Sequence, residues 1–192
     1  MDGEGTTKGE QTRARLRRAA TAVFARKGFH ATKVSDIVAE AGVSQPTFYI
    51  HFDAKEAAYD SLVEEFRENL RRVTRSNLID PATPSDRFVD RVALSFRRFL
   101  DFMAADRALT EIGFFQPPGC AVTKERLVAW VAANIAQEQS DGLFRRDVPA
   151  RHIAHLLVGL LDQVGRLEAD RDERERLAAT CATLFCQGAG QG

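Results

Sequence analysis

The sequence predicts an all-α protein of about nine helices, on three observations. Apolar residues recur at three- and four-residue spacing along nearly the whole chain, which is the period of an amphipathic helix. We find no stretch in which apolar and polar residues alternate as they do in a half-buried strand. Hydrophobic residues make up 44% of the 192 positions and charged residues 28%, a composition that excludes general disorder.

The first two helices follow a polar arm. Residues 1–11 carry glycine, threonine and charge without periodicity, and we expect them to be disordered. An amphipathic helix over residues 12–27 is then predicted to end at Gly28. Thr32 is a suitable N-cap for the next helix, which Gly42 ends in the left-handed conformation.

The next two helices differ in length. Ser44 is a suitable N-cap for a short helix over residues 45–52, and Pro46 lies in its first turn, where the missing N–H costs little. Asp53 is then expected to cap a longer helix over residues 54–75.

Five more helices are predicted in the remaining two thirds, before a flexible tail over residues 188–192. The second of the five is short and is expected to end at Gly113. Their approximate ranges are 88–103, 109–112, 122–139, 149–167 and 172–187.

Composition excludes several classes of protein. No uncharged run approaches the roughly 18 residues that span a bilayer, and the N-terminus lacks the apolar stretch of a signal peptide. Three cysteines, Cys120, Cys181 and Cys186, are too few for a disulfide framework and indicate a reducing compartment. We therefore expect a cytoplasmic protein with no membrane partner.

Charge is segregated although the formal net charge is zero. Residues 8–33 contain eight basic side chains and one acid, whereas residues 34–70 contain eight acids and two basic side chains. A basic N-terminal segment indicates contact with a polyanion, and a solvated helix face explains it equally well.

The most informative region is residues 32–52. Two short helices meet at a glycine-containing turn, Gly42–Ser44, and the preceding helix supplies Phe24 and Phe29 to cover their apolar sides. This is the arrangement of a three-helix helix-turn-helix unit, whose second motif helix fits the major groove of DNA.

Side-chain directions on the second motif helix support DNA binding. At about 100° per residue, Phe48 and Phe52 point inward together, whereas Gln45, Pro46 and Tyr49 face outward. A glutamine can form a bidentate pair with adenine, and proline or threonine can pack on the methyl group of thymine.

Phosphate contacts are expected around this helix. Tyr49 and His51 can donate hydrogen bonds to phosphates, and Thr32 and Lys33 lie at a helix N-terminus, where free N–H groups and the dipole attract anions. Lys55 is a cation in the first turn of a helix, which is unfavourable unless it meets a phosphate.

At four places the sequence resembles the DNA-binding signature of TetR-family transcriptional regulators. These are GFHATKVSDI at residues 28–37, AGVS at 41–44, TFYIHF at 47–52 and KE at 55–56. The resemblance covers about residues 12–70. It implies a DNA-binding domain over residues 12–56 and a ligand-binding and dimerisation domain over residues 57–187.

The resemblance also implies roles for individual residues. Ser35 falls where several relatives carry a longer side chain that reads a base, so less base readout is expected from the first motif helix. Phosphates would be contacted by Thr32, Tyr49, His51 and Lys55, and base edges by Gln45, Pro46 and Thr47. The complete expected DNA-binding set is Thr32, Lys33, Ser35, Ser44, Gln45, Pro46, Thr47, Tyr49, His51 and Lys55.

Small helix-turn-helix units bind specifically as dimers on two-fold sites, so part of this chain should dimerise. Its last two helices carry apolar stripes that could form a four-helix bundle between subunits, as TetR relatives do, or could fill the subunit's own core. The expected interface residues are Ile153, Leu157, Leu160, Leu161, Val164, Leu177, Cys181, Leu184 and Phe185.

The middle helices are rich in aromatic residues and, in this family, surround a ligand cavity. An apolar pocket would suit a small lipophilic or aromatic effector, and a solid core is the alternative. The expected pocket residues are Phe66, Phe96, Phe99, Met103, Phe114, Phe115, Trp130 and Asn134, with Gln116 and Gln137 as further polar candidates.

We therefore expect a ligand-responsive repressor that binds a palindromic double-stranded DNA operator as a homodimer, with no cofactor. One alternative is a helical protein-interaction adaptor that ignores DNA. The other is a metal-dependent enzyme that uses His152 and His155, with Cys181 and Cys186 nearby. The sequence contains none of the familiar catalytic motifs, so we expect no enzyme.

Overall fold

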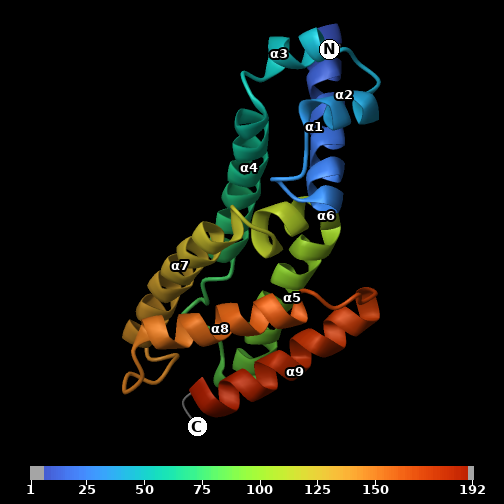
Figure 1. The fold of residues 1–192 in the computed structure, drawn as a ribbon. Helices are drawn as coiled ribbons and strands as arrows, with labels where there is room; N and C mark the ends of the chain where they lie inside the picture. The colour runs from blue at the N-terminus through green and yellow to red at the C-terminus, as the bar shows by residue number, and fades with distance from the viewer. Residues whose placement is uncertain (1–6, 190–192) are drawn as a thin grey trace, which may run out of the picture. The chain divides into compact units, whose positions relative to one another are not determined.

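The computed structural model describes residues 7–189, and every regular element in that range is a helix. This agrees with the all-α class and with the number of helices predicted from the apolar period. The α-helices are α1 (Lys8–Lys27), α2 (Val34–Ala41), α3 (Gln45–His51), α4 (Lys55–Ser76), α5 (Phe88–Ala105), α6 (Arg107–Thr110), α7 (Cys120–Ser140), α8 (Ala150–Val164) and α9 (Arg171–Ala189) (Figure 1). A 3₁₀ turn, η1 (Ser85–Arg87), and a π-helical turn, η2 (Glu111–Phe115), complete the set.

The chain forms two compact units. Unit 1 contains the described residues up to Phe66 together with Ala108–Cys120, so it is assembled from two separate stretches of sequence. In unit 1, α1, α2 and α3 pack around one apolar core, to which Phe24, Ile37 and Phe48 contribute fully buried side chains. Unit 1 therefore extends beyond the predicted DNA-binding segment, residues 12–56.

Tyr59 in α4 binds the later stretch of unit 1 to the earlier one. Its hydroxyl donates to the carbonyl of Ile112 and accepts from the N–H of Gly119, each at 3.1 Å. Gln116 adds a hydrogen bond from its Nε2 to the carbonyl of Ala25 in α1, at 2.9 Å. These bonds attach residues 108–120 to both α1 and α4.

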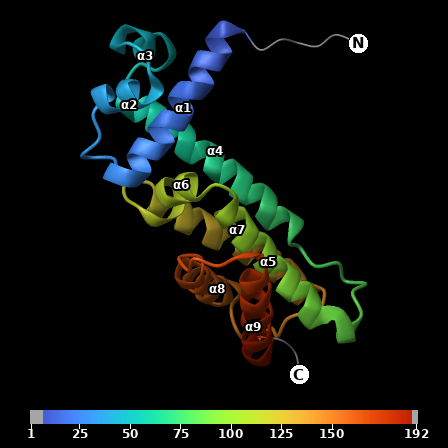
Figure 2. The same cartoon turned by 90° about the vertical axis from the view of Figure 1, so that its right-hand side faces the viewer.

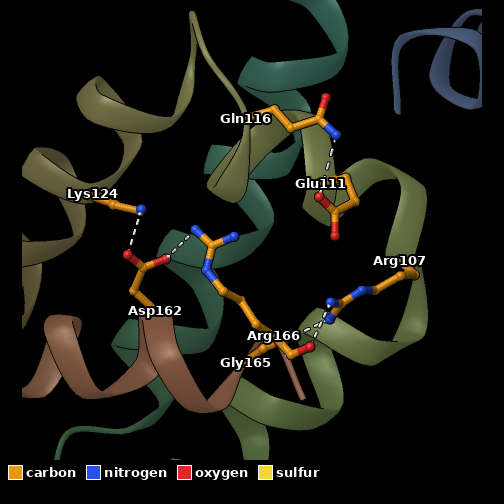
Figure 3. A network of polar contacts seen from close by, with 7 residues as sticks. All are labelled: Arg107, Glu111, Gln116, Lys124, Asp162, Gly165 and Arg166. Atoms are coloured by element: carbon orange, nitrogen blue, oxygen red, sulfur yellow. Dashed lines mark hydrogen bonds and ion pairs between the residues drawn. The ribbon is translucent and has the colours of Figure 1, made fainter. Parts of the chain in front are cut away.

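Unit 2 contains Arg67–Arg107 and the described residues from Ala121 onward. Within it α5 packs along α9, and α8 contacts both helices (Figure 2). Asp162 of α8 accepts from Lys124 of α7 at 2.8 Å and from Arg166 at 3.1 Å (Figure 3). This carboxylate therefore links α7 to the C-terminal end of α8.

The start of α1 differs from the prediction. The helix begins at Lys8, because Thr7 and Glu10 form a capping box: the Thr7 N–H donates to Glu10 Oε2 at 2.6 Å, and the Glu10 N–H donates to Thr7 Oγ1 at 3.3 Å. Residues 8–11, expected to be disordered, are therefore helical. The remaining arm, residues 1–6, lies outside the described range.

Two other predicted helix ends are wrong. Gly113 does not end a helix, since α6 passes directly into η2, where a glycine is needed because a Cβ at this position would lie 2.5 Å from Phe66 Cγ. At the other end of the chain, α9 continues through Gly188 to Ala189 of the predicted tail. The tail residues 190–192 lie outside the described range.

Candidate functional site

The turn between α2 and α3 has the geometry that the sequence predicts. Gly42 adopts the left-handed conformation, with φ +63° and ψ 43°, which a glycine reaches without a Cβ penalty. Its N–H donates to the carbonyls of Val38 and Ala39 and so ends α2. Ser44 is the N-cap residue of α3, and Pro46 lies in the first turn, where its missing N–H costs little.

Helix α3 has one buried face and one exposed face. Phe48 is completely buried and Phe52 nearly so, with their ring centroids 5.5 Å apart. On the other side, 53% of the surface of Tyr49 and 77% of that of Ile50 are exposed, and Gln45 is exposed as well. The predicted outward direction of Gln45 and Tyr49 is therefore confirmed.

Most of the residues expected to bind DNA lie at the surface of unit 1, and the set falls into three groups by burial. Lys33, Ser35, Ser44, Gln45, Pro46 and Tyr49 are exposed, Thr47, His51 and Lys55 are half-buried, and Thr32 is buried. The geometry of Thr32, Lys55 and Ser44 differs from what was expected.

Thr32 is not the cap of α2. The cap is Lys33, whose N–H donates to Asp36 Oδ2 at 3.0 Å. Only 2% of Thr32 is exposed, and its hydroxyl donates to the carbonyl of Gly28 at 2.7 Å. The threonine hydroxyl therefore stabilises the loop before α2 and does not face a phosphate.

Lys55 has a structural role that the sequence did not predict. Its Nζ donates to the carbonyls of Phe29 and Thr32, each at 3.0 Å, and lies 4.4 Å from the centroid of the Phe29 ring. The ammonium group therefore holds the α1–α2 loop against the first turn of α4. Two of its three donors are used in these bonds.

Ser44 and Thr47 interact with each other at the exposed start of α3. Their hydroxyl oxygens are 2.9 Å apart, and the Ser44 side chain makes no hydrogen bond that caps the helix. The pair therefore presents two hydroxyl groups beside Gln45 at the end of α3 expected to meet the bases.

Ion pairs within unit 1 explain the charge segregation seen in the sequence. Basic residues of α1 pair with acids from the following stretch: Arg17 with Glu65, Arg26 with Glu40 at 3.0 Å, and Lys27 with Asp36 at 2.8 Å. The hydrogen bond from Lys27 also holds the pKa of the Asp36 carboxyl below its ordinary value. Three of the eight basic residues of positions 8–33 are therefore paired with acids inside unit 1.

Arg15 completes the C-terminal end of α2. Its Nη2 donates to the carbonyl of Ala41 at 2.6 Å and to that of Gly42 at 3.3 Å. These are among the carbonyls that a helix end leaves without partners, and a cation is favoured there by the helix dipole. Arg15 therefore supports the helix-turn-helix from behind the turn.

Unit 2 contains a small apolar cavity with a volume of about 50 Å³. Helices α5 and α7 supply most of its wall, and the remaining residues come from the loops and from α8 and α9. The lining residues are Asn77, Ile79, Val92, Ser95, Phe96, Phe99, Val131, Ile135, Glu138, Phe144, Leu157 and Phe185. Only three of them, Asn77, Ser95 and Glu138, have polar side chains.

Comparison with known proteins identifies the family. Residues 16–62 match the family described as bacterial regulatory proteins, tetR family. The chain is 35% identical over 158 residues to the uncharacterized HTH-type transcriptional regulator YdgC of Bacillus subtilis (strain 168), covering 82% of this chain and 81% of YdgC. The chain belongs to the TetR family. It is a DNA-binding transcriptional regulator and not an enzyme.

Two further comparisons agree with this assignment. The TetR-family chain is 30% identical over 148 residues to the HTH-type transcriptional repressor DhaR of Mycobacterium sp. (strain GP1), covering 72% of each chain. A crystal structure of a bacterial regulatory protein in the tetR family from Rhodococcus RHA1 covers 97% of this chain and 100% of its own, with a TM-score of 0.75 at 21% identity. The latter likeness concerns the fold alone.

The expected pocket residues of this TetR-family chain are divided between several places. Phe96 and Phe99 line the cavity. Phe66, Phe114 and Phe115 belong to unit 1, where Phe114 lies 6.5 Å from Phe66 and 5.3 Å from Phe115 between ring centroids. Met103 is buried near the end of α5, and the Trp130 ring lies 5.8 Å from the Arg71 guanidinium.

The polar residues expected to orient a ligand are bonded elsewhere. Asn134 donates to the carbonyl of Thr74 at 2.8 Å, Gln137 donates to Asp141, and Gln116 donates to the backbone of α1. Two polar residues of the cavity lining, Asn77 and Glu138, were not among those expected from the sequence. A signal for Glu138 was present, because it continues the buried α7 stripe of Leu127, Val131 and Ile135 at helical spacing.

Several residues expected at the dimer interface lie in the core of unit 2. Ile153, Leu161 and Cys181 are each less than 5% exposed, which is the alternative that the sequence left open. Leu157, Leu160, Val164, Leu177 and Phe185 are half-buried, and Leu184 is 64% exposed. Leu156, which was not expected at the interface, is 71% exposed on the outer side of α8.

The cysteines and histidines of unit 2 form no recognisable metal site. Burial raises the pKa of the Cys186 thiol to about 11 and raises that of Cys181 as well, so both favour the protonated form. No group of three or more potential metal ligands occurs among residues 7–189, where His152 and His155 are both exposed. Within the same range, no helix is long and apolar enough to cross a bilayer.

Proposed function

We propose that this TetR-family chain is a cytoplasmic repressor that binds a palindromic DNA operator as a homodimer and releases it when a small lipophilic or aromatic effector is bound. The outward face of α3, fixed by the burial of Phe48 and Phe52, is the observation that carries the proposal. The name of DhaR as a repressor supports the direction of regulation.

The proposed interface with DNA centres on the N-terminal end of α3. Gln45 and Pro46 would reach base edges in the major groove, and the hydroxyl pair of Ser44 and Thr47 would lie beside them. The phosphates would be contacted from both motif helices by Lys33, Ser35, Tyr49 and His51. Thr32 and Lys55 would act through the loop that they stabilise.

The proposed dimer interface is formed by the outer sides of α8 and α9. Leu156 and Leu184 are large apolar side chains that are mostly exposed in the single subunit. A two-fold interface would bury both side chains from each of the two subunits. Gly159 has open space at its Cβ position, so it would allow a second helix to approach closely. Leu160 and Val164, both half-buried, would flank this contact.

The proposed effector site is the apolar cavity of unit 2. Its volume of about 50 Å³ is well below the roughly 300–1,000 Å³ found for ligand pockets, so an effector would have to widen the cavity as it binds. An effector regulates DNA binding only if it binds one conformation of the dimer more tightly than the other. The proposal therefore requires the filled cavity to favour a conformation that does not fit the operator.

Selection of bound sequences from random duplexes tests the proposal, with two variants that are expected to fail differently. Gln45→Ala should cost about 1–3 kcal/mol at one operator position and leave the others unaffected, because it removes a base contact. Lys33→Ala should weaken binding to every duplex and reduce the slope of log affinity against log salt by about 1.

Each outcome can contradict the proposal. An equal loss on all sequences for Gln45→Ala would remove α3 from the role of base reader. Failure of the unmodified chain to select an inverted repeat at low salt would contradict operator binding altogether.

A further inference from the structure

One buried acceptor in the cavity of unit 2 lacks a partner. Asn77 is 6% exposed, and its Oδ1 has no hydrogen-bond partner among the described residues. Its Nδ2 donates to the carbonyl of Ser95 at 3.3 Å. Because that carbonyl can only accept, the orientation of the amide is fixed, and Oδ1 is the end that remains unbonded. A buried acceptor without a partner destabilises the protein, and a ligand donor would satisfy it.

The other polar side chains of the cavity are already bonded. Ser95 Oγ accepts from Arg91 Nη1 at 2.7 Å and donates to the Arg91 carbonyl at 3.3 Å. Glu138 Oε1 accepts from the N–H of Ile79 at 2.9 Å. Among the fully buried side-chain oxygen and nitrogen atoms of the described residues, Asn77 Oδ1 is the one without a hydrogen-bond partner.

The polar groups at the cavity make it unfavourable for a charged ligand. The Glu138 carboxyl and the Asn77 oxygen would repel an anion. Arg91 donates to Ser95 Oγ and favours the ionised form of Glu138, so it would oppose a second cation at this carboxylate. The rest of the lining is almost entirely apolar and would leave a ligand charge without a partner.

We propose that the effector is a neutral, largely apolar molecule with one hydroxyl or N–H group that donates a hydrogen bond to Asn77 Oδ1. This inference rests on the proposed ligand response, and it adds the chemical class of the ligand. Alcohols, phenols and neutral amides, which supply a hydrogen-bond donor, are therefore expected to bind better than carboxylates, protonated amines and simple hydrocarbons.

Four probes with the same carbon skeleton test the inference by calorimetry at pH 7.5, without DNA. They are 3-phenylpropan-1-ol, its methyl ether, 3-phenylpropionate and protonated 3-phenylpropylamine. The alcohol should bind best, about tenfold more tightly than the ether, because the ether cannot donate to Asn77. A preference for the anion or the amine, equal binding of alcohol and ether, or no binding of any probe would overturn the inference.

Three variants locate the effect. Asn77→Leu should bind alcohol and ether equally, whereas the matched change Asn134→Leu, outside the cavity lining, should keep the tenfold preference. Val92→Phe places a ring in the cavity wall and should abolish binding of all four probes. Retained preference in Asn77→Leu, or retained binding in Val92→Phe, would also overturn the inference. If Asn77→Leu does not fold, the order of the four probe affinities for the unmodified protein still tests the inference.

The result is independent of the proposed regulatory function. Loss of the alcohol preference would leave operator selection unchanged, and the inference alone would fail. Probe binding that is strong but does not release operator DNA would instead contradict the proposed effector response.

Discussion

Among single side chains, Arg15 has an effect that reaches beyond its own helix. It is part of α1, yet its guanidinium donates to the last carbonyls of α2, immediately before the turn that positions α3. The position of the turn before α3 therefore depends on a basic residue of α1.

Replacing this arginine should lower stability and leave the phosphate contacts intact. We expect Arg15→Leu to reduce the free energy of unfolding by about 1 kcal/mol, because two carbonyl contacts of a charged donor are lost at a partly solvated site. Urea denaturation measures this change. Arg18→Leu, at an exposed position of the same helix, is the control and should have little effect. A reduced salt slope for Arg15→Leu on DNA would contradict the assignment.

Glu138 makes the stability of the protein depend on pH. Burial raises the pKa of its carboxyl from 4.5 to about 7, although the Ile79 N–H and Arg91 favour the ionised form, while Asp141 adds to the rise. The folded chain therefore binds a proton more tightly than the unfolded chain does. Stability should fall as pH increases from about 4.5 to 7, by about 3 kcal/mol in total from this group.

The substitution Glu138→Gln should remove that dependence. Glutamine keeps an oxygen for the Ile79 N–H and cannot ionise. Urea denaturation should show similar stability for the two proteins at pH 5 and a more stable variant at pH 8, by about 1–3 kcal/mol. Glu125→Gln, an exposed position on the same helix, should show no such difference. An equal effect of Glu138→Gln at both pH values would contradict the pKa shift.

Local sequence patterns predicted some residues correctly and misplaced others for a physical reason. Gly42 and Pro46 were predicted correctly because their backbone preferences are intrinsic. Thr32 was assigned to a phosphate because a threonine before a helix is commonly its cap, whereas its hydroxyl bonds back to Gly28. Lys55 was assigned to a phosphate because its bonds to the carbonyls of Phe29 and Thr32 form only when the loop before α2 meets α4. Such contacts depend on tertiary structure and leave no periodic signal.

At the scale of elements, η2 contains a glycine whose close contact leaves no room for a Cβ. Gly113 lies against the ring of Phe66 so closely that a Cβ would come 2.5 Å from Cγ and 2.6 Å from Cδ1. Residues 108–120 can keep their hydrogen bonds to Tyr59 only if this close approach is preserved.

Adding a methyl group at this position should therefore destabilise unit 1. We expect Gly113→Ala to lower the free energy of unfolding by about 1–3 kcal/mol through overpacking. Thermal unfolding followed by circular dichroism measures it. Gly9→Ala, where the nearest atom to a Cβ is 3.9 Å away, should be neutral or slightly stabilising. Equal melting temperatures for Gly113→Ala and the unmodified chain would contradict the close contact.

The buried face of a helix was predictable from the sequence where its apolar residues all pack against one core. It was not predictable where the apolar residues of a helix serve more than one packing surface. The period of α3 predicted its buried Phe48 and exposed Tyr49. The aromatic residues of the middle helices belong to two units, so periodicity could not say which of them, Phe96 or Phe114 for example, line a common space. The apolar stripes of α8 and α9 contain both core and exposed positions for the same reason.

For the whole molecule, the proposed homodimer depends on the exposed apolar side chains of α8 and α9. We expect Leu156→Asp to raise the dimer dissociation constant at least about tenfold, because it places a charge in an apolar contact. Sedimentation velocity measures this change, and operator affinity should fall in parallel. Leu94→Asp, at a partly exposed position of α5, is the control. A dimer unaffected by Leu156→Asp would place the interface elsewhere.

Unit 1 is built from two separate stretches of the chain, and this matters for any attempt to study DNA recognition with an isolated fragment. A chain truncated after Phe66 would lose Ile112 and Gly119, which are two partners of the Tyr59 hydroxyl, and it would lose the close contact between Gly113 and the Phe66 ring. Unit 1 therefore cannot be isolated by truncating the chain at one position. A minimal DNA-binding fragment must also include residues 108–120.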